Sequence, residues 1–193
     1  MAVTTVMPVV TAILATYGET TVAAFGVAGR IESLAAIPML ALSAAIGPIA
    51  GQSWGRGKVQ RVIDALKQSY LACFVWSLIV AVILWIFAEP IIMQFSNEVS
   101  VAKEASLYLM IVPLTLWGYG CVIVTAGGYN SLGKSVSGLG FYLIRTALLY
   151  VPLAFAASLL FDSTAVYFAI ALTNFLAGSI CVFMSLRWLK KQL

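Results

Sequence analysis

Histidine is absent from the 193-residue sequence, and charged residues and cysteines are scarce. Without histidine the chain has no Ser-His-Asp or Cys-His nucleophile, and most zinc sites lose a usual ligand. The three cysteines, Cys73, Cys121 and Cys181, stand singly in apolar runs without a CxxC pair. We therefore expect them to be small buried apolar residues rather than a disulfide framework or a metal site. We expect no metal and no organic cofactor.

Only 9% of the residues are charged, whereas 62% are hydrophobic. Typical soluble domains are about 25% charged and about 45–50% apolar. A water-soluble globule of this size could not bury so much apolar side chain, so this composition excludes an ordinary cytoplasmic enzyme and a disordered chain. The basic residues mostly occupy short loops rather than one face, which argues against a nucleic-acid partner. The composition predicts an integral membrane protein whose surface contacts membrane lipid.

Apolar runs of membrane-spanning length divide the sequence into six segments. A helix needs about 20 residues to cross the hydrocarbon core. The segments lie at 2–16, 21–51, 68–88, 105–126, 139–160 and 165–186. The expected fold is an all-α membrane protein, a single lobe of six transmembrane helices over residues 1–193. The first segment is short and has no basic flank, so we expect Met1 to lie within a helix and a preceding part to be missing.

Basic residues collect on alternate connections and at the C-terminus. That set comprises Arg56, Lys58, Arg61, Lys67, Lys134, Arg187, Lys190 and Lys191, whereas the other connections hold Glu19, Glu89, Glu98, Lys103, Glu104 and Asp162. By the positive-inside rule we expect a multi-pass protein of the inner (plasma) membrane with both termini in the cytoplasm. Residues 59–67, which include Arg61 and Lys67, place apolar and charged side chains at helical spacing. This pattern predicts a cytoplasmic amphipathic segment.

Residues 128–135, GYNSLGKS, match the phosphate-binding pattern G-x-x-x-x-G-K-[ST] letter for letter. A functional loop of this kind needs a preceding strand and a following helix in water. Here the residues join two expected spans, and the acidic partner candidate Asp162 falls on the opposite side of the membrane from Lys134. We interpret them as a tight glycine-rich turn with an anchoring lysine, not as a nucleotide site.

Three ionisable residues, Arg30, Glu32 and Arg145, fall inside the expected spans. Such side chains face the protein interior or a wet cavity, because lipid exposure is costly. Arg30 and Glu32 are two residues apart and so lie on opposite helix faces. At a rise of about 1.5 Å per residue, Glu32 and Arg145 reach comparable depths from opposite sides. We hypothesise that Glu32 and Arg145 form an ion pair or share a polar cavity between the second and fifth helices.

The roles of these residues stay open between two interpretations. An unpaired buried Glu32 can load and release a proton or bind a cation, whereas a permanent ion pair would only fix helix packing. Arg30 and Arg145 are candidates for a substrate cavity, and Tyr119, Tyr142, Thr173 and Asn174 can line it or simply bond between helices. Within spans, Pro38, Pro113 and Pro152 predict kinks, and Gly47, Gly51 and Gly55 predict close helix contact.

Two segments carry a family resemblance: residues 22–34, VAAFGVAGRIESL, and residues 47–57, GPIAGQSWGRG. They resemble the seventh-to-eighth helix region in the C-terminal lobe of multidrug and toxic compound extrusion (MATE) transporters. Residues 128–134 also resemble the loop after the family's tenth helix. The resemblance covers essentially the whole chain. It implies that the chain is one of the two six-helix lobes of a transporter, and that this transporter exchanges organic compounds for protons or sodium by alternating access.

The resemblance implies efflux of xenobiotics or other organic cations, coupled to H⁺ or Na⁺, and no enzymatic activity. The acidic residue that some members carry in the tenth helix is missing from residues 117–121, and the acidic cluster of the N-terminal lobe is missing with that lobe. By elimination Glu32 is the coupling candidate. Partners would be a small cationic or amphipathic substrate and either a missing N-terminal lobe or a second copy in a homodimer. Alternatives are a lipid-linked oligosaccharide flippase of the same superfamily and an inactive membrane scaffold or partner subunit.

Overall fold

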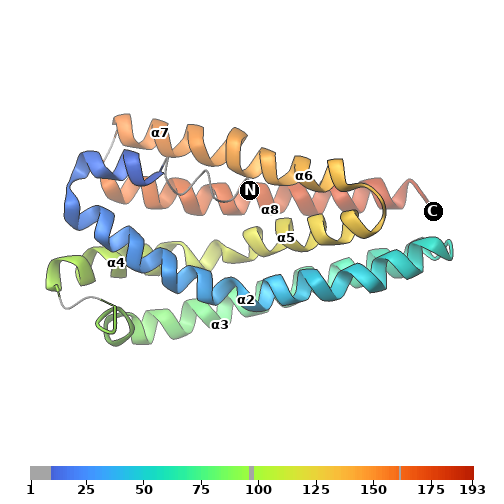
Figure 1. Ribbon diagram of the computed structural model, residues 1–193, viewed down its shortest axis with the longest axis horizontal. Coiled ribbons are helices and arrows are strands. Elements are labelled where there is room, and N and C mark those ends of the chain that lie inside the picture. Colours follow the sequence, from blue (N-terminus) through green and yellow to red (C-terminus); the bar gives the residue numbers. More distant parts are fainter. Residues whose placement is uncertain (1–9, 96–97, 161) are drawn as a thin grey trace.

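The computed structural model describes residues 10–95, 98–160 and 162–193, and these residues form an elongated bundle of helices without a strand (Figure 1). In chain order the elements are η1 (Ala15–Tyr17), α2 (Glu19–Gly55), α3 (Val59–Ile92), α4 (Val99–Ile111), η2 (Pro113–Thr115), α5 (Leu116–Ser131), α6 (Ser135–Leu143), the π-helix η3 (Ile144–Tyr150), α7 (Val151–Leu160) and α8 (Ser163–Lys190). The expected all-α membrane fold is confirmed.

Five helical stretches in the described part of the chain are long and apolar enough to cross a membrane, at Glu19–Gly55, Val59–Ile92, Val99–Ser131, Ser135–Leu159 and Ser163–Lys190. They correspond to the second to sixth predicted spans. The first predicted span, 2–16, lies mostly outside the described residues. The spans are longer than predicted, because polar residues at their ends continue the helices beyond the apolar runs.

The amphipathic segment 59–67 is not a separate element but the first turns of α3. Four of its apolar side chains, Val59, Val62, Ile63 and Leu66, are buried in the core cluster at this end of the bundle, and Arg61, Asp64 and Lys67 are exposed. The alternation therefore orients the start of a spanning helix against its neighbours.

Two of the spans are interrupted where the sequence carries proline. Pro113 opens the short 3-10 helix η2 between α4 and α5, and Pro152 follows the π-helix η3 at the start of α7. Pro38, by contrast, lies inside α2, which continues through it as a helix. In α3 the backbone leaves helical geometry at Phe87, three residues before Pro90. Proline thus marks most of the irregular positions, because it cannot donate the hydrogen bond that the preceding turn needs.

Small residues set the closest helix contacts. Gly118 of α5 lies against the backbone carbonyl of Asn174 on α8, and Gly178 of α8 lies against Gly118 in return. Gly51 packs against Ser131, and Gly47 lies in ordinary contact with the same residue, as their spacing predicted. The third glycine of that series, Gly55, has open space around it. The three cysteines are free and buried, as expected.

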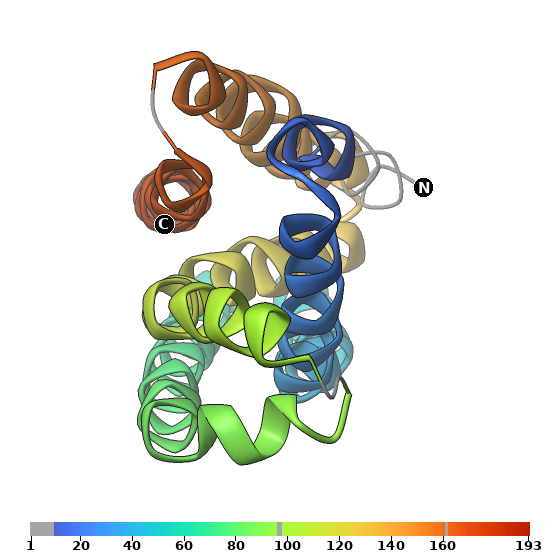
Figure 2. The same ribbon diagram turned by 90° about the vertical axis from the view of Figure 1, so that its left-hand side faces the viewer.

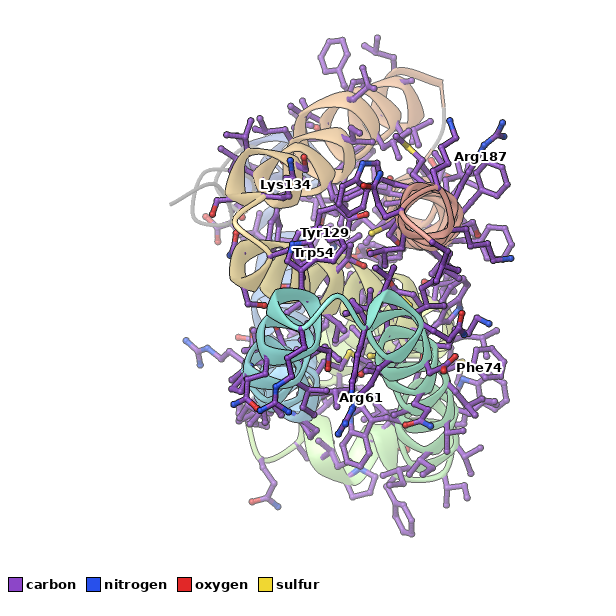
Figure 3. The ribbon with its side chains drawn as sticks, turned by 90° about the vertical axis from the view of Figure 1, so that its right-hand side faces the viewer. Trp54, Arg61, Phe74, Tyr129, Lys134 and Arg187 are labelled. Carbon is purple, nitrogen blue, oxygen red and sulfur yellow. The ribbon has the colours of Figure 1, made fainter. Side chains whose placement is uncertain are left out.

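Charge is separated between the two ends of the bundle. The α2–α3 and α5–α6 connections and the C-terminus lie at one end, and the beginning of α2 and the α7–α8 connection lie at the other (Figure 1). Arg61, Lys134 and Arg187 all appear at the first end (Figure 3), whereas Figure 2 views the second, with α7 at one edge of the bundle and α3 at the opposite edge. This arrangement agrees with the predicted alternation of basic and acidic connections.

The glycine-rich residues 128–135 form the end of α5, a short turn and the first residue of α6. Gly133 takes a φ of 73°, which favours glycine, and the Lys134 ammonium lies 6.0 Å from the centroid of the Trp188 ring. The run that precedes this turn, 122–125, is helical rather than extended. The geometry is that of a tight turn and not of a phosphate-binding loop.

We predict that Gly118→Ala destabilises the protein. The new Cβ would overlap the Asn174 carbonyl, which belongs to a helix backbone and cannot rotate away. Overpacking of this kind costs about 1–3 kcal/mol. Gly26→Ala is the control, because Gly26 is also helical and has open space around it. Thermal unfolding in detergent, followed by size-exclusion chromatography, should show a lower midpoint for Gly118→Ala alone. Equal midpoints would contradict the importance of this contact.

Candidate functional site

A cavity of about 190 Å³ lies between α2, α4, α5 and η3. It is lined by Phe25, Gly29, Glu32, Ser33, Ala36, Leu40, Tyr108, Tyr119, Arg145, Thr146 and Tyr150. One carboxyl and one guanidinium therefore share a cavity among spanning helices. The cavity combines hydrophobic walls with a few converging polar groups, which is the usual composition of a ligand site.

Glu32 enters the cavity from α2 and is held by a tyrosine. The Tyr108 hydroxyl of α4 donates a hydrogen bond to Glu32 Oε2 at 2.5 Å. Tyr108 is itself fixed by edge-on aromatic contacts with Phe25 at 5.8 Å and Tyr167 at 5.2 Å between ring centroids. The carboxyl thus has a defined position and a neutral hydrogen-bond partner, so its charge is not cancelled by that partner.

Arg145 lies on η3 and is 8% exposed. Its Nε and Nη2 atoms donate to Oδ1 of Asn174 on α8, at 3.2 and 2.8 Å. The guanidinium carbon lies 4.2 Å from the ring centroid of Tyr119 and 5.7 Å from that of Tyr150. A cation over an aromatic face is attracted by the ring quadrupole, and the attraction is stronger where water is excluded. The positive charge is therefore stabilised by neutral groups and stays available to the cavity.

The structure brings Glu32 and Arg145 to one cavity without a direct ion pair between them, as far as the described residues extend. Of the two arrangements considered from the sequence, the shared cavity matches the geometry and the direct pair does not. The reason is that each charge has a hydrogen-bond partner of its own on another helix: Tyr108 of α4 for the carboxyl and Asn174 of α8 for the guanidinium.

The other candidate residues have different positions. Tyr119 lines the cavity, whereas Asn174 is fully buried behind Arg145, with its Nδ2 atom lacking a partner among the described residues. Tyr142 is half-buried outside the cavity, and its backbone carbonyl accepts a hydrogen bond from the Thr146 hydroxyl. Arg30 is exposed and does not line the cavity, because its separation of two residues from Glu32 turns it to the other face of α2.

The sequence did not identify Tyr108, Thr146 and Tyr150 as cavity residues. Thr146 and Tyr150 reach the cavity with Arg145 because this stretch is a π-helix. Its i→i+5 hydrogen bonds widen the turn, so residues five apart lie nearly above one another. For Tyr108 the available signal was a tyrosine alone in an apolar span, since a buried hydroxyl needs a partner.

These observations describe a helical membrane protein with a polar cavity among its spans. Its sequence matches the MatE family profile over residues 1–156. It is 32% identical over 179 residues to a FAD transporter of Shewanella oneidensis and 25% identical over 152 residues to the probable multidrug resistance protein YpnP of Bacillus subtilis. These matches cover 93% and 79% of this chain but only 40% and 34% of the relatives, so the chain spans well under half of their length.

Solved structures show the same fold. A MOP superfamily transporter from Pyrococcus furiosus superposes with a TM-score of 0.93 at 19% identity, over 99% of this chain and 44% of its own. The Vibrio cholerae MATE transporter VcmN in its bent form superposes with a TM-score of 0.88 at 23% identity, over 95% of this chain and 42% of its own. The chain belongs to the MATE family, whose members are transporters rather than enzymes.

We predict that Asn174→Ala lowers the stability of the protein to unfolding, because Arg145 loses its hydrogen-bond acceptor. The substitution removes the acceptor of two hydrogen bonds from a buried guanidinium. Hydrogen bonds to charged groups contribute about 1.5–3 kcal/mol. The matched control is Asn130→Ala, because Asn130 is an exposed asparagine near the end of α5. Unfolding midpoints in detergent should fall for Asn174→Ala and remain near wild type for Asn130→Ala. Equal losses would mean that the guanidinium does not depend on Asn174.

Proposed function

We propose that residues 1–193 form one lobe of a cation-coupled antiporter that exports xenobiotics or other organic cations. The observation that carries this proposal is the cavity in which Glu32 and Arg145 lie together, each bonded to a neutral side chain. A relative named as a probable multidrug resistance protein supports the choice of cargo. Transport as such rests on the family, whereas the cargo, the coupling and the direction are our proposal.

In this mechanism Glu32 is the coupling residue. An ionised carboxylate attracts an organic cation into the cavity, and binding of H⁺ or Na⁺ to the same carboxylate removes that attraction. The coupling ion and the cargo then compete for one site, which is the requirement for exchange. Tyr108 can donate its hydrogen bond to the carboxyl in either state, so the side chain keeps its position while its charge changes.

The remaining candidate residues shape this site. Tyr119 presents its ring at the cavity wall and keeps the Arg145 guanidinium in place from one side, while Asn174 does so from another. Tyr142 precedes this group by about one helical turn and fixes Thr146 through its backbone. We propose that these groups orient the cargo, and that Arg30, exposed on α2, faces a further part of the transporter.

That further part would be a second six-helix lobe, either an N-terminal portion of the same polypeptide or a second copy of this chain. The length of the relatives supports the proposal, because the chain spans 40% of the Shewanella protein. We further propose that the protein lies in the inner membrane with its basic end, and hence both termini, in the cytoplasm. The separation of charge between the two ends supports this orientation.

We predict that Glu32→Gln abolishes ion-driven cargo movement. The amide cannot lose a proton or attract a cation strongly. The chain, alone and fused to the N-terminal lobe of the Shewanella relative, would be reconstituted into liposomes, and ethidium movement would be followed under an imposed pH or Na⁺ gradient. The fused form should transport and its Glu32→Gln variant should not.

Glu104→Gln is the matched control for this experiment. Glu104 also accepts a hydrogen bond from a tyrosine, Tyr167, at 3.3 Å, but it does not line the cavity. This variant should keep gradient-driven transport. Undiminished coupling in Glu32→Gln would overturn the assignment. If neither the chain nor the fused form moves ethidium, a scaffold role is favoured over efflux.

A second candidate cargo is an anionic dinucleotide such as FAD. Two observations favour it: the 32% identical relative is named a FAD transporter, and the cavity holds a guanidinium whose partners are neutral. A guanidinium is well suited to phosphate, because its planar donors match two oxygens at once. In this alternative Arg145 binds the cargo and Glu32 carries the coupling ion.

Binding measurements on the purified chain distinguish the two cargoes. If the cargo is anionic, Arg145→Gln should weaken FAD binding by about tenfold or more, since a charge-assisted contact of about 1.5–3 kcal/mol is lost. If the cargo is cationic, Glu32→Gln should weaken ethidium binding instead. Arg187→Gln is the control, because Arg187 lies away from the cavity near the C-terminal end of α8. Fluorescence anisotropy of either ligand provides the measurement, and equal effects of Arg145→Gln and Arg187→Gln would exclude the anionic cargo.

A further inference from the structure

A second, smaller cleft lies where α2 passes into α3, at the basic end of the bundle. Its volume is about 140 Å³, and it is lined by Pro48, Ile49, Gln52, Ser53, Arg56, Lys58 and Arg61. None of these side chains lines the cavity that holds Glu32 and Arg145. Part of the cleft comes from the run GQSWGRG at 51–57, which the proposed transport mechanism does not use.

The backbone at this cleft turns sharply into the start of a long helix. The amides of Gly57 and Lys58 donate to the carbonyls of Trp54 and Ser53, and Gly57 has a φ of 68°. The 34-residue helix α3 then begins at Val59, and Lys58, which precedes it, makes no capping bond with its side chain. The first amides of an α-helix lack internal acceptors and carry a partial positive charge, so this position favours an anion.

Three cationic side chains surround the cleft without acidic partners. Arg56, Lys58 and Arg61 are exposed and form no ion pair within the described part of the chain. The nearby acid, Asp64, does not line the cleft, and its Oδ1 atom accepts a hydrogen bond from Gln60 Nε2 at 2.9 Å. The cleft thus has an excess of positive charge with nothing in the described residues to balance it.

Ser53 supplies an independent indication of a ligand. It is only 5% exposed and lines the cleft, yet its hydroxyl makes no hydrogen bond to any described residue. The hydroxyl is not one of the fully buried polar atoms, so it is accessible from the cleft, and its hydrogen-bonding capacity is left to a group that enters there. A ligand oxygen in the cleft would provide that partner.

We propose that this cleft binds the phosphate group of an anionic phospholipid. Arg56, Lys58 and Arg61 neutralise the phosphate, the Ser53 hydroxyl donates to one of its oxygens, and the amino end of α3 adds its partial charge. The cleft is large enough for a phosphate but not for acyl chains, which lie outside along the exposed Ile49 and Pro48 of α2. Basic pockets at the ends of spanning helices commonly recognise lipid headgroups in this way.

The test uses the full chain in detergent and native mass spectrometry with dioctanoyl phosphatidylglycerol, dioctanoyl phosphatidylcholine and inorganic phosphate as probes. Wild type should bind the anionic lipid in preference to the zwitterionic one. The triple variant Arg56→Gln/Lys58→Gln/Arg61→Gln should lose about tenfold or more in affinity for phosphatidylglycerol, given the loss of three cations. Ser53→Ala, which keeps every charge, should lose about three- to tenfold.

The matched control removes three cations from the same end of the bundle but away from the cleft: Arg187→Gln/Lys190→Gln/Lys191→Gln. It should change the affinity by less than about threefold, since only diffuse attraction is lost. Equal losses in the two triple variants, or no effect of Ser53→Ala, would overturn the proposal in favour of a diffusely basic surface. Binding of inorganic phosphate as tight as that of phosphatidylglycerol would overturn the assignment to a lipid and make free phosphate the ligand.

Discussion

The close approach of α5 and α8 at Gly118 and Gly178 is the constraint on which the polar cavity depends. With no side chain on either glycine, the two backbones come into contact, and the carbonyl of Asn174 lies against Gly118. The residue after Gly118 is Tyr119, whose ring covers one side of the Arg145 guanidinium, while the Asn174 amide accepts its hydrogen bonds. One helix contact therefore positions both groups that stabilise the buried charge. In lipid no hydrophobic effect drives helices together, so close van der Waals packing at small residues stabilises their association instead.

The π-helix η3 brings Arg145 and Tyr150 to the same cavity. In a regular α-helix, residues five apart such as Arg145 and Tyr150 would be turned by about 140° from each other, at 3.6 residues per turn. The wider turn of η3 brings both side chains to the cavity, where the second ring lies 5.7 Å from the guanidinium carbon. The result is a positive charge stabilised without a carboxylate. Glu32 is therefore left with Tyr108 as its own partner, and both charges remain able to respond to a ligand.

Sequence reasoning predicted the spans and the convergence of Glu32 and Arg145, because both depend on hydrophobic length and on depth along a helix. It did not predict which face of each helix points inward. In α2 the buried positions include Ala24, Ala28 and Ala36, whereas the larger Leu34 and Ile37 are exposed. Large apolar side chains lie on both faces of α2, because Phe25 and Met39 are buried, so residue size and hydrophobicity alone do not identify the inward face of a helix in lipid. The π-helix has no sequence signal of its own, and its cavity residues Thr146 and Tyr150 were missed for that reason.

Arg30 is the polar counterpart of these outward-facing residues. It lies on the outer face of α2, about 16 Å along the helix from Glu19 at about 1.5 Å per residue, and is exposed in this chain. A guanidinium at such a depth is costly in hydrocarbon, so it must meet protein or a water-filled cavity. Within the described part of the chain Arg30 has no carboxylate partner, and it does not line the cavity that holds Glu32 and Arg145. The exposure of Arg30 therefore supports the second lobe that we propose. The face of α2 that carries Arg30 needs contact with protein or water, because lipid cannot solvate a guanidinium.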